Sequence, residues 1–271
     1  MKRLRSFIAG ASLAAILPTS ALAGSVIVLK TEGFGLNAPT SEATVYLDGT
    51  RIRIDSKETG ADVTVIYNRP ANKDGVFWLI DNQRRVYTEI SRQTMLDAKA
   101  DIEVAIEMAK KEFEELPPDQ RKQAAKVFAE RVGVGAFMED PVTYKKVSSG
   151  IDIGGWTCSH YEGIQDGEKT EEVWAAHLDE IGLSADDLGG MKDMSDLFVT
   201  VGQKLPPFFR LAAGDPEDKG SFPGFPVVIV SYTNGQRSEK SEVAKVQKQN
   251  LADSLFALPK GLTKRASQLD R

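Results

Sequence analysis

Two histidines and one cysteine supply all the imidazole and thiol groups of the 271-residue chain. The cysteine and one histidine lie together in Cys158-Ser159-His160, and the second histidine is His177. A cysteine close to a histidine is the arrangement that activates thiol nucleophiles, and the same side chains are ligands for zinc. Both kinds of chemistry depend on how the segments that carry these residues pair with each other.

The predicted pairing keeps the two histidines too far apart to share a metal ion. A turn at 165–168 predicts a hairpin in which His160 lies near Val173 and Trp156 lies near His177. Alternate residues of a strand are about 6.8 Å apart, so the two histidines would lie about 13 Å from each other. Zinc needs ligand bonds of about 2 Å. The sequence therefore predicts no metal site and no cofactor.

A catalytic constellation is also missing from the sequence. No third group near Cys158 and His160 is placed to orient the histidine as a base, and no Gly-x-Ser-x-Gly motif is present. Carboxylates are abundant, but residues such as Glu103 and Glu107 lie on a helix face, where exposure to solvent is the expected use. We predict that Cys158 is a small buried hydrophobic residue and that no residue is catalytic. A hydrolase, including one with paired carboxylates, stays an alternative.

Apolar side chains of adaptable shape gather between residues 191 and 209. Met191, Met194 and Phe198 recur at helical spacing, and Phe208 and Phe209 follow two prolines. Methionine and aromatic side chains often line adaptable apolar pockets, such as those that receive acyl chains. The same pattern is typical of a helix packed on a sheet. These five residues are candidate ligand-lining residues, with ordinary core packing as the alternative.

The N-terminal segment 1–23 has the three-part layout of a secretory signal peptide. A basic start at Met1–Arg5 precedes an apolar run at Phe7–Leu17, and small residues precede a predicted cleavage after Ala23. The apolar run is about half of the roughly 20 residues that span a bilayer. Without this segment the formal charge falls from −5 to −8, because it contains three basic residues and no acidic one. We expect a periplasmic protein that neither spans the membrane nor binds nucleic acid.

The remaining chain, 24–271, predicts a single α+β domain of consecutive antiparallel strands. Alternating or β-branched runs predict strands at 25–31, 44–54, 63–67, 76–80, 85–90, 142–148, 156–163, 170–178, 226–233 and 237–247. Asp48-Gly49 and Asn234-Gly235 are hairpin signals. A three- to four-residue apolar period predicts a helical insertion at 91–131 and a further helix at 183–201.

Six segments, taken in order, carry a family resemblance. They are Tyr46–Asp55, Trp78–Ile90, Gly154–Tyr161, Glu172–Trp174, Gly224–Val227 and Phe256–Gly261. The ordered set resembles a family of exported bacterial proteins defined by the domain of unknown function numbered 4412. That family is similar in architecture to the Lol-type periplasmic lipoprotein carriers. The resemblance implies a half-barrel, a curved and unclosed antiparallel sheet of roughly ten or more strands. Amphipathic helices would cover its concave face, which receives acyl chains in the Lol-type carriers.

Three functional hypotheses follow from these observations. The first is a periplasmic protein that binds or carries an apolar, lipid-like ligand on the concave face. The second is an envelope module that binds a protein partner and no small ligand, with an exposed patch at 203–225. The third is a hydrolase that loses activity when Cys158 or His160 is replaced.

Overall fold

The structure of the chain is a computed structural model. It describes residues 24–35, 38–58, 60–69, 75–117, 119–121, 123–124, 127–128, 142–200 and 222–267, with the backbone alone for 197–200. The predicted signal peptide lies outside the described residues.

Twelve strands form one sheet. The strands are β1 (Gly24–Gly33), β2 (Thr40–Asp48), β3 (Arg51–Glu58), β4 (Ala61–Asn68), β5 (Val76–Asp81), β6 (Val86–Ser91), β7 (Thr143–Ile153), β8 (Trp156–Gln165), β9 (Glu168–Ala176), β10 (Phe225–Thr233), β11 (Gln236–Gln249) and β12 (Thr263–Arg265). Their order across the sheet is β12-β6-β5-β4-β3-β2-β1-β11-β10-β9-β8-β7. All neighbours pair antiparallel except β12, which runs parallel to β6.

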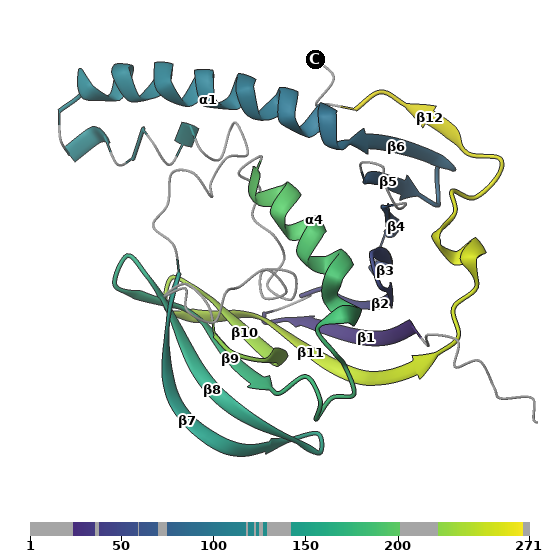
Figure 1. Cartoon of the computed structure of the whole chain (residues 1–271). Helices are drawn as coiled ribbons and strands as arrows, with labels where there is room; N and C mark the ends of the chain where they lie inside the picture. Colours follow the sequence, from purple (N-terminus) through teal and green to yellow (C-terminus); the bar gives the residue numbers. More distant parts are fainter. Residues whose placement is uncertain are drawn as a thin grey trace, which may run out of the picture.

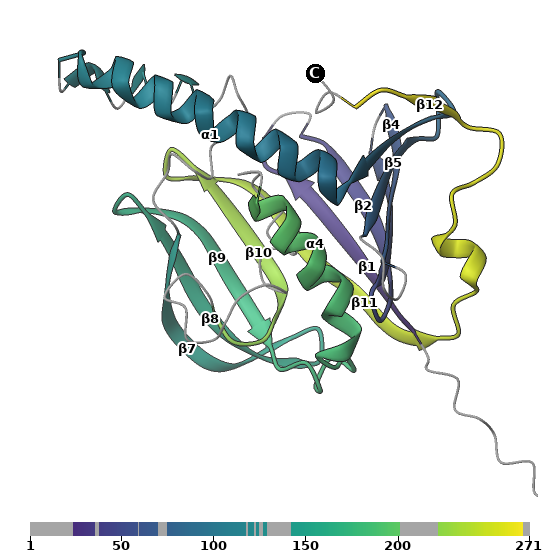
Figure 2. The same ribbon diagram turned by 45° about the horizontal axis from the view of Figure 1, so that its top comes forward.

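The sheet is strongly curved and its two edge strands, β12 and β7, do not meet (Figure 1). The resulting hollow holds α4 (Gly189–Thr200), which follows the short 3-10 helix η1 (Asp186–Leu188). In Figure 2, α4 runs along the hollow and α1 (Arg92–Glu114) lies across one end of it. The predicted α+β class, with an unclosed antiparallel half-barrel and helices over its concave face, is confirmed.

Tight turns join consecutive strands where the sequence predicts them. Asn234 and Gly235 both have positive φ values, 53° and 74°, as do Asp166 and Gly167, with 54° and 80°. Two successive positive φ values are the mark of a type I′ turn, whose twist matches that of the strands on either side. The β10–β11 and β8–β9 hairpins therefore follow from local turn chemistry.

Helix α1 begins and is oriented as its sequence predicts. The Ser91 hydroxyl accepts a hydrogen bond from the Thr94 backbone N–H (3.0 Å) and caps the helix. The buried residues Met95, Ala98, Ile106 and Ala109 repeat at three- and eight-residue steps, so one stripe faces inward. The described parts of 119–128 are also helical, and the remainder of the predicted helix to 131 lies outside the described residues.

The C-terminal segment covers part of the outer face of the sheet, which the sequence did not predict. The 3-10 helix η2 (Asp253–Phe256) lies against β3 and β4, and β12 then adds to the β6 edge (Figure 1). Phe256, Ile66 and Ile80 are all buried, and alternation places the two isoleucines on the face opposite to the hollow. Part of the N-terminal half of the sheet is therefore buried on both faces.

Candidate functional site

The floor of the hollow is an apolar row that crosses four strands. The register pairs Leu47 with Ile52, Ile52 with Tyr67, and Tyr67 with Phe77, and paired residues lie on the same face. All four side chains are buried, and the Tyr67 and Phe77 rings lie 4.6 Å apart between centroids. This row is the part of the core on which α4 packs.

Helix α4 approaches the sheet closely because its second residue is a glycine. A Cβ atom at Gly190 would lie 2.9 Å from Ile52 Cγ1 and 3.0 Å from the carbonyl carbon of Thr50. The Gly190 N–H donates to the Gly49 carbonyl oxygen at 2.8 Å. The start of α4 is therefore fixed to the β2–β3 turn by a contact that only glycine permits.

Asp187, just before α4, fixes the same end of the helix to two strands. Its carboxylate accepts hydrogen bonds from the Ser25 hydroxyl on β1 (2.9 Å) and from Lys248 Nζ on β11 (2.6 and 2.7 Å). It also accepts from the Ser184 N–H and hydroxyl (2.7 and 2.6 Å). Burial raises the pKa of Asp187, but the bonds from Lys248, Ser184 and Ser25 outweigh it, and the pKa is lowered. The carboxylate is thus ionised at neutral pH.

The next row of the hollow is open at one end. It runs from Val45 through Ile54 and Val65 to Leu79 in the paired register. The exposed fraction rises along it from 2% at Val45 to 45% at Leu79, with Ile54 and Val65 half-buried. Apolar side chains that line a concave face and remain accessible are typical of a surface that another molecule covers. We take this row, together with α4, as the candidate functional site.

A buried carboxylate lies on the other half of the hollow. The Glu171 side chain on β9 is buried and hydrogen bonds to the Tyr144 hydroxyl on β7. Gly163 lies between them in the register, and a Cβ there would be 2.7 Å from Glu171 Cγ. The Phe222 ring packs against both Tyr144 and Tyr161. This end of the hollow is therefore an aromatic cluster that contains one buried carboxylate, that of Glu171.

The structure places two of the five candidate lining residues in the core. Met191 and Met194 are 2% and 3% exposed and belong to the same apolar cluster as the floor of the hollow. Phe198 lies in α4, but its side chain is not among those described. Phe208 and Phe209 lie outside the described residues. Helical spacing located the buried face of α4 but could not distinguish a packed methionine from one that contacts a ligand.

The thiol of Cys158 is buried and unreactive in its setting. Burial, together with the carboxylates of Glu180 and Asp152, raises the pKa of this thiol to about 11. Its sulfur donates to the Trp156 carbonyl oxygen at 3.5 Å and makes no hydrogen bond to His160. The geometry matches the predicted role of a small buried hydrophobic residue.

The pairing predicted for His160 was wrong by one residue. His160 pairs with Trp174 rather than Val173, because the β8–β9 register shifts between Gly163 and Ile164. The His160 and Trp174 rings stack at 4.5 Å, and His160 Nε2 lies 3.7 Å from Glu172 Oε1. Strand β9 ends at Ala176, so His177 is exposed beyond it. Among the residues that the structure describes, no group of three or more potential metal ligands comes together.

Glu172 is the centre of a polar cluster on the face turned away from the hollow. Tyr232 and Lys169 donate to its carboxylate, and the Lys169 ammonium lies 4.4 Å from the centre of the Tyr232 ring. Burial raises the pKa of Glu172, but the donors outweigh burial and lower it. The cluster joins β9 and β10 by charge-assisted bonds and adds no nucleophile.

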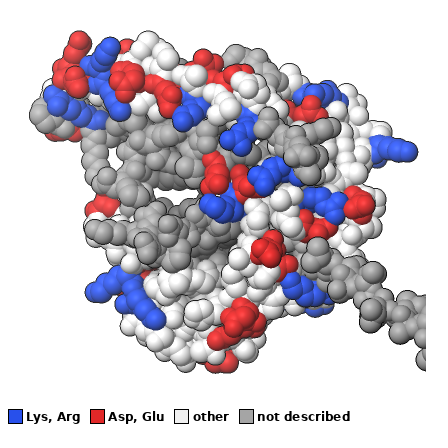
Figure 3. Space-filling model, viewed as in Figure 1, with Lys and Arg blue, Asp and Glu red and all other residues white. Residues whose placement is uncertain are grey.

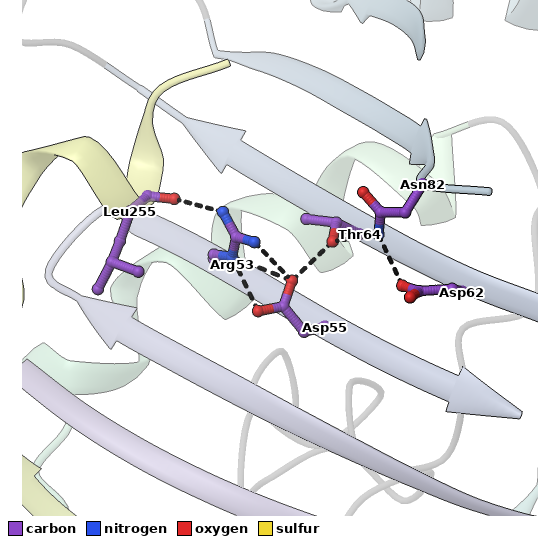
Figure 4. Close-up of polar contacts among 6 residues, drawn as sticks. All are labelled: Arg53, Asp55, Asp62, Thr64, Asn82 and Leu255. Atoms are coloured by element: carbon purple, nitrogen blue, oxygen red, sulfur yellow. Dashed lines mark hydrogen bonds and ion pairs between the residues drawn. The ribbon is translucent and has the colours of Figure 1, made fainter. Parts of the chain in front are cut away.

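A second polar network fixes the C-terminal segment to the outer face, as Figure 4 shows. Arg53 donates to both oxygens of Asp55 (3.0 and 2.9 Å) and to the Leu255 carbonyl oxygen (3.1 Å). Thr64 donates to Asp55 at 2.7 Å, and Asn82 donates to Thr64 at 3.0 Å. Every member accepts or donates to a neighbour in the network, so we interpret it as structural. The alternating charges of β3 predicted only that these side chains face away from the core.

Surface charges do not mark a further site on the face seen in Figure 3. Acidic and basic side chains alternate over α1, where Lys99 pairs with Glu103 and Lys110 pairs with Glu107. In the part of the chain that the structure describes, no helix is long and apolar enough to cross a membrane.

The fold and this site together define an open half-barrel with an apolar concave face. A family model described as a domain of unknown function (DUF4412) matches residues 92–262, more than half of the chain. The protein belongs to this family, as its ordered sequence segments predicted.

Two further comparisons add no functional information. A search of curated proteins found no match. Among solved structures, that of PNGF-II in space group C2 aligns with 90% of this chain at 12% sequence identity and a TM-score of 0.37. The aligned part is 31% of the PNGF-II chain, so this protein spans about a third of its length.

Proposed function

We propose that the protein is an exported carrier that binds an apolar, acyl-type ligand on the concave face of its sheet. The row from Val45 to Leu79 carries the proposal, because it continues the buried floor yet opens to solvent at Leu79. An acyl chain that lay along this row would bury the accessible parts of Ile54, Val65 and Leu79. Burial of apolar surface at about 25 cal/mol per Å² is the driving force for such binding.

The attachment of α4 also supports a carrier. Its N-terminal end is held by Asp187, Gly190 and the ion pair between Arg69 and Asp193 (2.9 Å). A helix fixed at one end can hold the hollow in shape while a ligand enters beside it. The sequence resemblance to a family that is similar in architecture to the Lol-type carriers points in the same direction, and the signal-peptide layout of residues 1–23 supports periplasmic export.

Binding can be tested on the delipidated protein that begins at Gly24. We expect native mass spectrometry to show bound acyl ligand after re-exposure, and a fluorescent apolar probe to be displaced by long-chain acyl compounds. The change Leu79→Glu should weaken binding about tenfold or more, because a carboxylate resists burial against an acyl chain.

The matched control is Val104→Glu on α1, where the side chain is 60% exposed and lies outside the hollow. This variant should bind like the wild type. If neither co-purification nor rebinding of any acyl compound is seen, the carrier proposal fails.

The second candidate is a module that binds a protein partner in the envelope. It is favoured by Leu96, Val104 and Met108, which are exposed apolar residues at multiples of four positions along α1. The patch expected at 203–225 lies almost entirely outside the described residues. In this case Val104→Glu should abolish cross-linking to a partner in the envelope. Unchanged ligand binding in the same variant would favour this second function.

A further inference from the structure

One hydroxyl group is buried on the helix that faces the hollow without a hydrogen-bond partner. Ser195 of α4 is 1% exposed, and its Oγ atom neither donates nor accepts a hydrogen bond. Ser195 lies one turn after Met191 and next to Met194, so all three belong to the buried face of the helix. Figure 2 shows this helix running along the hollow.

A buried hydroxyl without a partner is unfavourable for the empty protein. On folding, the Ser195 hydroxyl loses its hydrogen bonds to water and forms none within the protein. Alanine would fill nearly the same space and is also the better helix former. Two other buried serines of the hollow do have partners: Ser25 donates to Asp187 at 2.9 Å, and the Ser241 hydroxyl lies 2.8 Å from that of Thr31. Ser195 therefore differs from the buried serines of the strands.

We infer that the Ser195 hydroxyl is the polar contact for the bound ligand. The inference rests on the proposed carrier function and specifies its ligand class, an acyl compound with an uncharged oxygen such as an ester carbonyl. Two cations close to this helix are already paired, Arg69 with Asp193 at 2.9 Å and Lys192 with Asp196 at 3.6 Å. Burying an ionised ligand carboxylate beside Ser195 would be costly unless a further cation paired with it. An ester carbonyl needs only one donor, which Ser195 provides.

The test compares two probes of similar length, methyl dodecanoate and tetradecane, in competition with a fluorescent apolar probe. Wild-type protein should prefer the ester by about tenfold, the value of one hydrogen bond of moderate strength. Ser195→Ala should remove this preference while leaving tetradecane binding unchanged. Its thermal midpoint should equal or exceed that of the wild type, since the hydroxyl has no partner in the empty fold.

Ser241→Ala is the matched control, because it removes a buried serine hydroxyl that does have a partner. It should lower the thermal midpoint and keep the preference for the ester. A preference that survives in Ser195→Ala, or a loss of stability as large as in Ser241→Ala, overturns the role of Ser195 and leaves the carrier function standing. If wild type binds neither probe, the carrier function itself fails.

Discussion

Cys158 shows how the setting of one residue decides whether a reactive group can react. Its thiol lies in the core with a pKa raised to about 11 by burial and by nearby Glu180 and Asp152. The nucleophile is the thiolate, which forms only to a negligible extent at neutral pH in this setting. Proximity to His160 in the sequence therefore has no chemical consequence in the fold.

We expect the folded protein to resist thiol reagents at pH 8 and to react fully once unfolded in guanidinium. The measurement is the rate of thiol modification by Ellman's reagent with and without denaturant. Because the folded pKa is raised above the ordinary value of 9.0, the thiol also contributes stability that is lost as the pH rises from about 9 towards 11. Cys158→Ala should lack that decline, and rapid modification of the native protein would contradict the assignment.

At the scale of elements, the position of α4 depends on a glycine contact. Gly190→Ala would place a methyl group 2.9 Å from Ile52 Cγ1 and 3.0 Å from the Thr50 backbone, so the helix would have to shift. Overpacking of this kind costs typically about 1–3 kcal/mol. Urea denaturation and hydrogen exchange of the α4 amides would measure the loss.

Gly189, the residue before Gly190, provides the matched control for this prediction. A Cβ at Gly189 would meet nothing closer than the Gly49 carbonyl oxygen at 3.4 Å. Gly189→Ala should therefore be neutral or stabilising by up to about 1 kcal/mol, because alanine favours the helix. Equal effects of the two substitutions would show that helix propensity, and not the contact with β3, sets the position of α4.

At the scale of the whole molecule, the C-terminal segment joins the end of the chain to its first half. Phe256 is buried on the outer face, the Arg51 guanidinium lies 4.6 Å from its ring centre, and Asn68 donates to its carbonyl oxygen at 3.4 Å. Lys264 donates to Glu89 at 2.7 Å farther along. Residues 250–267 therefore cover the outer face of the sheet over β3 and β4 and extend its β6 edge.

Replacing Phe256 by alanine should lower the free energy of unfolding by about 3–5 kcal/mol, as large-to-small changes in cores do. The measurement is urea denaturation at neutral pH. Leu258→Ala, at a half-buried position in the same segment, should cost clearly less. If Phe256→Ala lowers the free energy of unfolding no more than Leu258→Ala does, burial of the Phe256 ring is not what stabilises the outer face.

Local signals predicted most of the strands and hairpins, for reasons that the structure makes plain. Positive φ at Asn234 and Gly235 is built into those residue types, and the alternation of β3 follows from having one face in the core. Strand β12 was missed because its three residues, Thr263–Arg265, are all exposed and show no alternation. The β8–β9 register was missed because a shift between Gly163 and Ile164 leaves no sequence signal.

The sequence by itself determined the family, the α+β class and the inward face of most strands and of α1 and α4, because these depend on side-chain type at a fixed local period. Only the tertiary structure decided that Val45 is sealed and Leu79 is open in the same row, and that the Ser195 hydroxyl has no partner. The physical reason is that exposure depends on the curvature of the sheet and on where α4 lies over it. Both arise from contacts between residues far apart in the chain, such as Asp187 with Lys248.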